Sequence, residues 1–236
     1  MKADPDIRGI SITVECGDRL PPRRSLAMYT LHWALECGSF APHAALNEVG
    51  ASYELVKVDL GSEQHHAPEF LAVNPRAQVP VLTLPDGTVM TESVAMVMHI
   101  ADCHRESSLM PGLGETDRAI AYRWLMFSAV NLYETGCRIS HPHHYSENEP
   151  DYEGIRAKGC TDLDRYWDML VDAIRDGPFF LGQRFSAVDI CLLMIAQWHF
   201  DSETLLKRHP KLVALCDATR NRPAVKKVWD LNFVLA

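Results

Sequence analysis

Two short stretches of the sequence carry residues that together suit the binding of a small acidic peptide. The first is Val79-Pro80, in which the proline precedes an apolar run. Proline has no N–H to donate, so it takes the first position of a strand or an edge, and the backbone of Val79 is then free to pair with a ligand. The second is Glu92-Ser93, which begins an apolar-periodic segment as a helix does. Helix N-termini have unpaired N–H groups that favour a carboxylate, so we expect these two stretches to form one site.

Cys37 and Ser39 lie just before a predicted helix over residues 42–46, which has Pro42 in its first turn and Gly50 after its end. A cysteine near a helix N-terminus can have a lowered pKa and act as a nucleophile. A serine there can cap the helix or donate a hydrogen bond. The residue types leave the roles open, because a buried inert thiol and a capping hydroxyl fit the same positions.

A group of histidines, His141, His143 and His144, resembles a metal cluster at first sight. No Cys or Asp accompanies them at ligand spacing, and Pro142 interrupts any helix. Zinc sites use defined ligand sets. The sequence therefore predicts a polar stretch here and no metal.

The composition narrows the class of protein. The chain has 236 residues, of which 47% are hydrophobic, and a net charge of −8, which argues against nucleic-acid binding. No apolar run is long enough to predict a membrane span. The seven cysteines are odd in number and form no CxxC pair, so we expect a reducing, cytoplasmic setting. Residues 1–27 lack the apolar stretch of a secretory signal and are predicted to be an N-terminal extension.

Strand and helix patterns alternate in the N-terminal part of the chain. Apolar patterns predict strands over 28–33, 53–59, 79–84 and 88–90, the last two joined by a turn at 85–87. Helical patterns predict the helix over 42–46, a short turn over 69–73 and a helix after Glu92-Ser93. Tyr29, in the first strand, is expected in the core. This order over residues 28–104 resembles a thioredoxin-like domain.

The strand patterns end at residue 104, and the rest of the chain is expected to be helical. Residues 105–115 contain Pro111, Gly112 and Gly114 and are predicted to link to an all-helical domain over 116–236. Helical spacing recurs around 121–133 and 163–174, and two weaker helices are predicted over 211–219 and 223–234. The predicted fold class is therefore an α/β domain followed by an all-α domain.

The most specific local signal in the second half is a capping box from Ser186 to Asp189, with Asp in place of the usual Glu or Gln. Phe185 and Ile190 flank it as a hydrophobic staple. The helix that follows, to about Phe200, is apolar almost all round, as helices in the middle of a core are. We expect its side chains in the core, among them Cys191, Met194 and Trp198.

Taken in order, these motifs resemble the soluble glutathione S-transferase family, and bacterial members in particular. The resemblance covers residues 28–234 and rests on the segments 39–43, 68–75, 78–82, 91–93, 180–182 and 185–190. It implies a transferase of alkyl or aryl groups that uses glutathione as co-substrate, needs no metal, acts on a hydrophobic electrophile and forms a homodimer.

The resemblance also implies which residues bind glutathione. Pro80 would follow a cis bond, with the Val79 backbone paired to the cysteinyl part of the ligand. At the γ-glutamyl end of glutathione, the amino group would pair with a buried Glu92 carboxylate. The γ-glutamyl carboxylate would bind to Ser93. The remaining polar contacts implied are His65 near the glycyl carboxylate, its neighbour His66, and Gln78.

By the same resemblance, Ser39 would donate a hydrogen bond to the glutathione sulfur and favour the thiolate. A hydrogen bond to a charged group contributes about 1.5–3 kcal/mol, and a helix N-terminus about 0.3–1 kcal/mol. At about 1.36 kcal/mol for each pKa unit, the two together would lower the thiol pKa by about one or two units.

Two other functions remain open at this point. Some bacterial members have a cysteine just before the position of Ser39, but Gly38 stands there and Cys37 comes one residue earlier. A glutathione-dependent thiol/disulfide reductase would use Cys37 in a mixed disulfide. A non-catalytic binding protein of the same fold is the other alternative, although it has no need of the intact Val79-Pro80 and Glu92-Ser93. The acceptor pocket is predicted near Tyr133, Arg138 and Tyr145.

Overall fold

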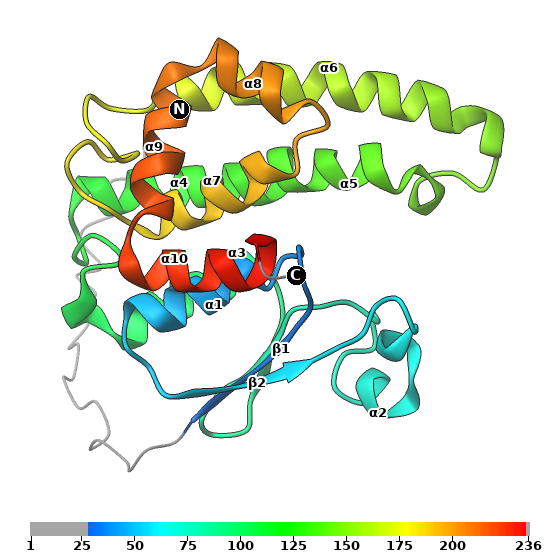
Figure 1. Ribbon diagram of the computed structural model, residues 1–236, viewed down its shortest axis with the longest axis horizontal. Helices are drawn as coiled ribbons and strands as arrows, with labels where there is room; N and C mark the ends of the chain where they lie inside the picture. Colours follow the sequence, from blue (N-terminus) through cyan, green and yellow to red (C-terminus); the bar gives the residue numbers. More distant parts are fainter. Residues whose placement is uncertain (1–27, 235–236) are drawn as a thin grey trace, which may run out of the picture.

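The computed structural model describes residues 28–234 and consists of a sheet with its helices, followed by a bundle of helices (Figure 1). The predicted extension over residues 1–27 lies outside the described residues. The sheet order is β2-β1-β3-β4, from strands β1 (Tyr29–Trp33), β2 (Tyr53–Lys57), β3 (Val81–Thr83) and β4 (Val89–Met90). β1 and β2 are parallel, whereas β3 is antiparallel to β1 and to β4. The predicted thioredoxin-like half is thus confirmed.

The strands are shorter than predicted, and one difference bears on the site. β3 begins at Val81 rather than at Val79, because Pro80 has no N–H with which to extend the ladder. The predicted strand over 53–59 ends at Lys57, and Met28 precedes β1. Tyr29 is buried in the core, as predicted. The Val79-Pro80 step is therefore a connection that leads into the sheet rather than part of it.

Two helices of the first half, α1 (Phe40–Glu48) and α3 (Ser93–Cys103), lie between the sheet and the helical bundle (Figure 1). They pack against each other, and α1 begins earlier than the predicted residue 42. The short segments η1 (Gln64–His66) and α2 (Pro68–Leu71) form a separate lobe. Phe70 of α2 attaches this lobe to the sheet through a small cluster with Val58 and Val81.

The C-terminal half is all-helical, as predicted. Its helices are α4 (Thr116–Phe127), the π-helical segment η3 (Ser128–Tyr133), α5 (Glu134–Ser140), α6 (Tyr152–Val171), α7 (Ala187–Gln197), α8 (Ser202–Arg208), α9 (Pro210–Arg220) and α10 (Pro223–Trp229), with the π-helical η6 (Asp230–Val234) last. The predicted linker contains a short 3-10 helix, η2 (Arg105–Ser107). α6 lies along α5, where an added β-carbon at Gly159 would be 2.8 Å from Ile139 Cγ1, so the glycine permits this close packing.

α7 occupies the centre of the molecule. It contacts α1 and α3 of the first half as well as α4 and α9 of the second. Every residue from Ala187 to Ala196 is buried, which confirms the prediction from its apolar sequence. Cys191 and Met194 are core residues, whereas Trp198 lies past the end of the helix and is only partly buried. The position of Trp198 matters below, because its ring contacts Tyr133.

The predicted capping box is present at the start of α7. The Asp189 carboxylate accepts the backbone N–H of Ser186 at 2.7 Å and also that of Phe180, at 2.7 Å. The Ser186 hydroxyl lies 3.1 Å from the same carboxylate. Asp189 is buried, so it both caps α7 and holds the preceding loop in place.

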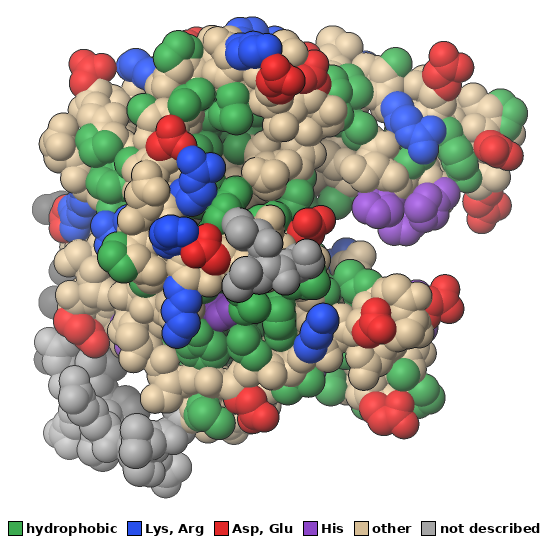
Figure 2. Space-filling view, viewed as in Figure 1, with side chains coloured by type: hydrophobic (Ala, Val, Ile, Leu, Met, Phe, Trp, Pro, Cys, Tyr) green, Lys and Arg blue, Asp and Glu red, His purple; other side chains and the backbone are tan. Residues whose placement is uncertain are grey.

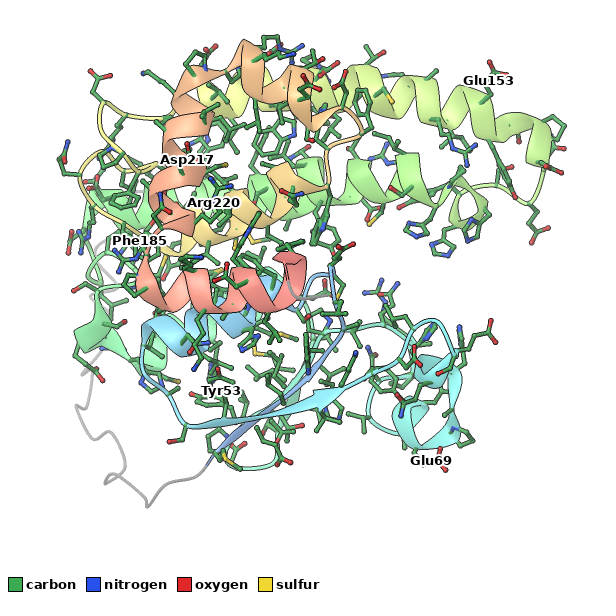
Figure 3. The ribbon with its side chains drawn as sticks, viewed as in Figure 1. Tyr53, Glu69, Glu153, Phe185, Asp217 and Arg220 are labelled. Carbon is green, nitrogen blue, oxygen red and sulfur yellow. The ribbon has the colours of Figure 1, made fainter. Side chains whose placement is uncertain are left out.

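The last helix returns to the first half of the chain. Arg222, just before α10, forms two hydrogen bonds of 2.9 and 2.8 Å with the carboxylate of Glu48 at the end of α1. The same guanidinium lies 3.8 Å over the ring of Phe185, which is labelled in Figure 3. A bidentate arginine–carboxylate pair also fixes geometry. The two halves are therefore docked through a defined polar contact as well as through the apolar core.

Candidate active site

The Val79–Pro80 peptide bond is cis, and Pro80 is buried. Within residues 28–234 the backbone N–H and C=O of Val79 make no hydrogen bond. The loop before it is held by buried Asn74, whose side-chain amide donates to the Gln78 carbonyl at 2.7 Å and whose side-chain oxygen accepts the Arg76 N–H at 3.1 Å. The backbone of Val79 is thus presented by an ordered loop and is available to a ligand. This role of Asn74 was not predicted from the sequence, although the Asn-Pro pair is a turn signal.

Ser93 is the first residue of α3, and Glu92 stands at its N-cap with a φ of 68°. Such a backbone is uncommon for a residue other than glycine and is found more often at functional sites. The Glu92 side chain is 67% exposed and pairs with Arg76 at 2.9 Å. The expectation that the Glu92 carboxylate is buried is therefore wrong, because this carboxylate points to the surface. The pair nevertheless connects the loop before Val79 with the start of α3.

Gly38 is the point at which these segments meet. A β-carbon added to Gly38 would lie 2.8 Å from Ser93 Oγ, 2.8 Å from Tyr133 Oη and 3.2 Å from Pro80 Cδ. Only glycine fits without displacing a neighbour. We refer to Gly38, Pro80, Ser93 and Tyr133 as the Gly38 junction. It brings two predicted glutathione-binding residues together with a tyrosine from the helical domain.

The side chains of Ser39 and Cys37 both contact the backbone carbonyl of Ala34. Ser39 is 1% exposed, and its hydroxyl donates to the Ala34 carbonyl at 2.9 Å. Cys37 Sγ lies 3.3 Å from the same carbonyl and 3.1 Å from Ser39 Oγ. A serine hydroxyl has a single proton to donate. The geometry therefore does not support Ser39 as the donor to a ligand sulfur, since its proton already holds the loop before α1.

Tyr133 ends the π-helical segment η3, and its ring meets that of Trp198 edge-on at a centroid distance of 5.4 Å. Burial, and then the neighbouring Cys137 and Cys37 thiols, raise the pKa of the Tyr133 phenol well above its usual value. The phenol thus keeps its proton at neutral pH. Tyr133 Oη, which lies beside Gly38, makes no hydrogen bond to another group within residues 28–234, so this proton remains free to be donated.

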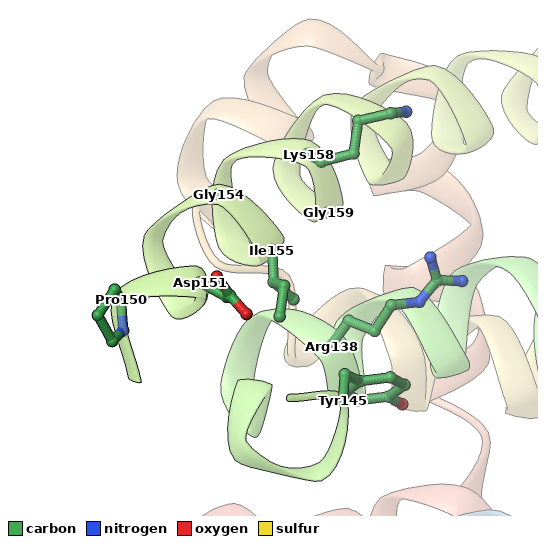
Figure 4. A pocket seen from close by; sticks show the side chains of 8 residues that line it. All are labelled: Arg138, Tyr145, Pro150, Asp151, Gly154, Ile155, Lys158 and Gly159. Atoms are coloured by element: carbon green, nitrogen blue, oxygen red, sulfur yellow. The ribbon is translucent and has the colours of Figure 1, made fainter. Parts of the chain in front are cut away.

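The predicted acceptor residues do not form one pocket. Arg138 and Tyr145 line an open cavity of about 580 Å³ between α5 and α6 (Figure 4). Tyr133 instead lies at the Gly38 junction. The other lining residues are Pro150, Asp151, Gly154, Ile155, Lys158 and Gly159. No residue of the Gly38 junction lines this cavity. The prediction of an acceptor pocket near all three residues therefore does not correspond to a single cavity here.

The remaining predicted contacts lie on the small lobe and the loop. His65 is partly buried in η1, its Nδ1 has no hydrogen-bond partner, and its ring lies 4.1 Å from that of His66. The Gln78 side chain is exposed, and its carbonyl is taken by Asn74. Within residues 28–234 no hydrogen bond joins His65, His66 or the Gln78 side chain to the Gly38 junction. Their contact with glutathione stays a prediction.

His141, His143 and His144 follow α5, where the rings of His141 and His144 stack with centroids 5.5 Å apart. Figure 2 shows histidines gathered on the helical domain, above a hollow that separates it from the lobe carrying α2. The described part of the chain contains no group of three or more side chains arranged to hold a metal ion. It also contains no helix long and apolar enough to cross a membrane.

Comparison with known proteins extends these observations. The family models "Glutathione S-transferase, N-terminal domain" and "Glutathione S-transferase, C-terminal domain" match residues 27–102 and 141–229. The chain is 29% identical to glutathione S-transferase GstA of Escherichia coli O157:H7, over 80% of this chain and 90% of that protein.

Two solved structures are similar along nearly their whole length. A glutathione transferase from Methylococcus capsulatus str. Bath is 30% identical, with a TM-score of 0.73, over 87% of this chain and 98% of that chain. A sphingomonad glutathione S-transferase complexed with glutathione is 28% identical, with a TM-score of 0.74, over 87% of this chain and 99% of that chain. The two family models together span the sheet and most of the helical bundle. This chain belongs to the glutathione S-transferase family.

Proposed function

We propose that the chain binds glutathione at the Gly38 junction and joins the glutathione thiolate to an electrophilic small molecule. The observation that carries this proposal is the convergence of Pro80, Ser93 and Tyr133 on Gly38. Three separate segments, from both halves of the chain, meet at this point, and two of them present a hydroxyl group there, Ser93 Oγ and Tyr133 Oη. A binding protein with no chemistry has no need of a tyrosine hydroxyl there that makes no other hydrogen bond.

The ligand is held by backbone and helix-end groups. The N–H and C=O of Val79, which have no partner within residues 28–234, pair with the cysteinyl residue of glutathione. The Ser93 hydroxyl and the first N–H groups of α3 take the γ-glutamyl carboxylate, because a helix N-terminus favours an anion. Glu92 stands next to this carboxylate and accepts the ligand's amino group, with Arg76 as its present partner.

The reaction needs only a thiolate and a nearby electrophilic carbon. The thiol proton passes to water, the sulfur lone pair forms the new S–C bond, and the leaving group departs with the electrons of its bond. The edge-on rings of Tyr133 and Trp198 supply apolar surface beside the junction for a hydrophobic acceptor. Lowering the thiol pKa toward the ambient pH raises the fraction of thiolate, which is the reactive species.

Replacing Ser93 with alanine is expected to weaken glutathione binding by about tenfold or more. A hydrogen bond to a charged group contributes about 1.5–3 kcal/mol, and a tenfold change in affinity corresponds to about 1.4 kcal/mol. Isothermal titration calorimetry with glutathione measures the effect directly. Ser62→Ala is the matched control, because Ser62 lies on an exposed loop next to Asp59. Failure of the wild type to bind glutathione would refute the proposed function.

A thiol/disulfide reductase is the second candidate, and one observation favours it. Cys37 is a partly exposed free thiol just before α1, one residue from Gly38, and its Sγ lies 3.1 Å from Ser39 Oγ. Assays of aryl halide conjugation and of disulfide reduction on the same Cys37→Ser preparation separate the two functions. Conjugation retained in this variant supports the transferase. Loss of a strong wild-type reductase activity in Cys37→Ser would assign the protein to the reductases instead.

We also propose a homodimer. Met126 and Val130, four residues apart where α4 continues into η3, are 51% and 57% exposed although both are apolar. Exposed apolar side chains that lie close together often mark a protein interface. Sedimentation velocity of the wild type and of Val130→Glu tests this. A monomeric wild type at micromolar concentration contradicts it.

A further inference from the structure

Tyr133 Oη is the polar group at the Gly38 junction whose proton is not already used. It lies 2.8 Å from the point where a Gly38 β-carbon would stand, as does Ser93 Oγ. Ser93 begins α3 and is occupied by the ligand carboxylate in the proposed function. Tyr133 reaches the same point from the helical domain and makes no other hydrogen bond within residues 28–234.

The alternative donors before α1 are both committed to the backbone. The Ser39 hydroxyl is buried and donates to the Ala34 carbonyl at 2.9 Å. The Cys37 thiol approaches the same carbonyl at 3.3 Å. To serve a ligand sulfur, Ser39 would have to give up this buried hydrogen bond and leave the Ala34 carbonyl with only the longer contact from the Cys37 thiol.

We propose that Tyr133 is the catalytic residue that donates a hydrogen bond to the glutathione sulfur and stabilises its thiolate. The inference rests on the proposed function, since it requires glutathione at the junction. A peptide paired with Val79 and anchored at Ser93 lies across Pro80, where the Tyr133 hydroxyl faces it. The thiol proton leaves to water, and Tyr133 keeps its own proton throughout, so it acts as a hydrogen-bond donor and not as a base.

The surroundings of Tyr133 suit a donor. Burial keeps the phenol protonated by raising its pKa, so it does not compete with the thiol for ionisation. The edge-on contact with Trp198 restricts the ring, and the π-helical turn η3 ends at this residue. π-helical segments are often found at functional sites. A donor held in place in this way loses little conformational freedom when it binds the sulfur.

The test measures the pKa of the thiol of bound glutathione. Ultraviolet absorbance of the thiolate, recorded across a range of pH, gives this pKa. In Tyr133→Phe this pKa is expected to rise by about one to two units. Glutathione affinity, from calorimetry, should change little. The rate of aryl halide conjugation should fall about tenfold for each unit at neutral pH and recover as the pH is raised. Tyr166→Phe is the matched control, because Tyr166 is a partly buried tyrosine of α6, outside the junction.

The outcomes distinguish this inference from the function on which it rests. A wild type that binds no glutathione overturns both. A wild type that binds glutathione, together with a Tyr133→Phe variant of unchanged thiol pKa, overturns this inference alone. If the thiol pKa rises in Ser39→Ala and is unchanged in Tyr133→Phe, the hydrogen bond to the sulfur comes from Ser39. That result also overturns the inference about Tyr133. Melting temperatures of the variants confirm that each is folded.

Discussion

Asp189→Ala is expected to lower the free energy of unfolding by about 3 kcal/mol. The carboxylate accepts the buried N–H groups of Phe180 and Ser186, both at 2.7 Å, and lies 3.1 Å from the Ser186 hydroxyl. Each buried donor that loses its acceptor costs about 1–3 kcal/mol. Urea unfolding followed by circular dichroism measures the difference. Glutathione affinity of the folded variant should stay near that of the wild type, because Asp189 lies in the helical domain, outside the Gly38 junction.

Asp189→Asn is the control and adds a pH test. Burial raises the pKa of Asp189 to about 7, despite the hydrogen bonds that lower it. The folded state therefore holds a proton that the unfolded chain releases above its ordinary pKa of 3.8. The contribution of this group to stability is complete below about pH 4 and is lost as the pH rises toward 7. Asp189→Asn should lack this decline. Equal stability of Asp189→Ala and the wild type would contradict the central role given to the cap.

A second large effect is expected at the Gly38 junction. Gly38→Val should reduce glutathione affinity more than a hundredfold, an effect of about 2.8 kcal/mol. Its β-carbon would stand 2.8 Å from the oxygens of Ser93 and Tyr133 and 3.2 Å from Pro80 Cδ. The two hydroxyls must move away, and the added methyl groups lie against the proline. Calorimetry with glutathione gives the affinity.

Gly154→Val controls for the loss of a glycine, because nothing lies within 4 Å of a β-carbon added there. It should bind glutathione as the wild type does. If Gly38→Val does not fold, Gly38→Ala serves instead, with the same direction and a smaller loss. Normal binding by a folded Gly38→Val would show that glutathione does not use the junction.

The sequence determined those features that depend on neighbours along the chain. The capping box joins Ser186 and Asp189, three residues apart, so a local pattern specifies it. Pro80 stands before β3 because proline cannot donate to a ladder, whatever the rest of the fold. The apolar composition of α7 required burial, and the order of strands and helices was enough to indicate the fold class. The same local patterns predicted that Val79, Pro80 and Ser93 belong to one site, and the structure brings Pro80 and Ser93 together at Gly38.

The tertiary structure decided which of these groups are free to act. The hydroxyl of Ser39 is used by Ala34, and the carboxylate of Glu92 turns outward to Arg76. A side chain's residue type does not reveal such partners, since they depend on the path of the loop. The meeting of Tyr133 with Gly38 depends on how the helical domain docks. That docking is set by contacts such as Arg222 with Glu48, which are 174 residues apart in the chain. Hydrophobic periodicity indicates which face of a helix is buried. Only the packed core determines which distant segment the side chains of that helix contact.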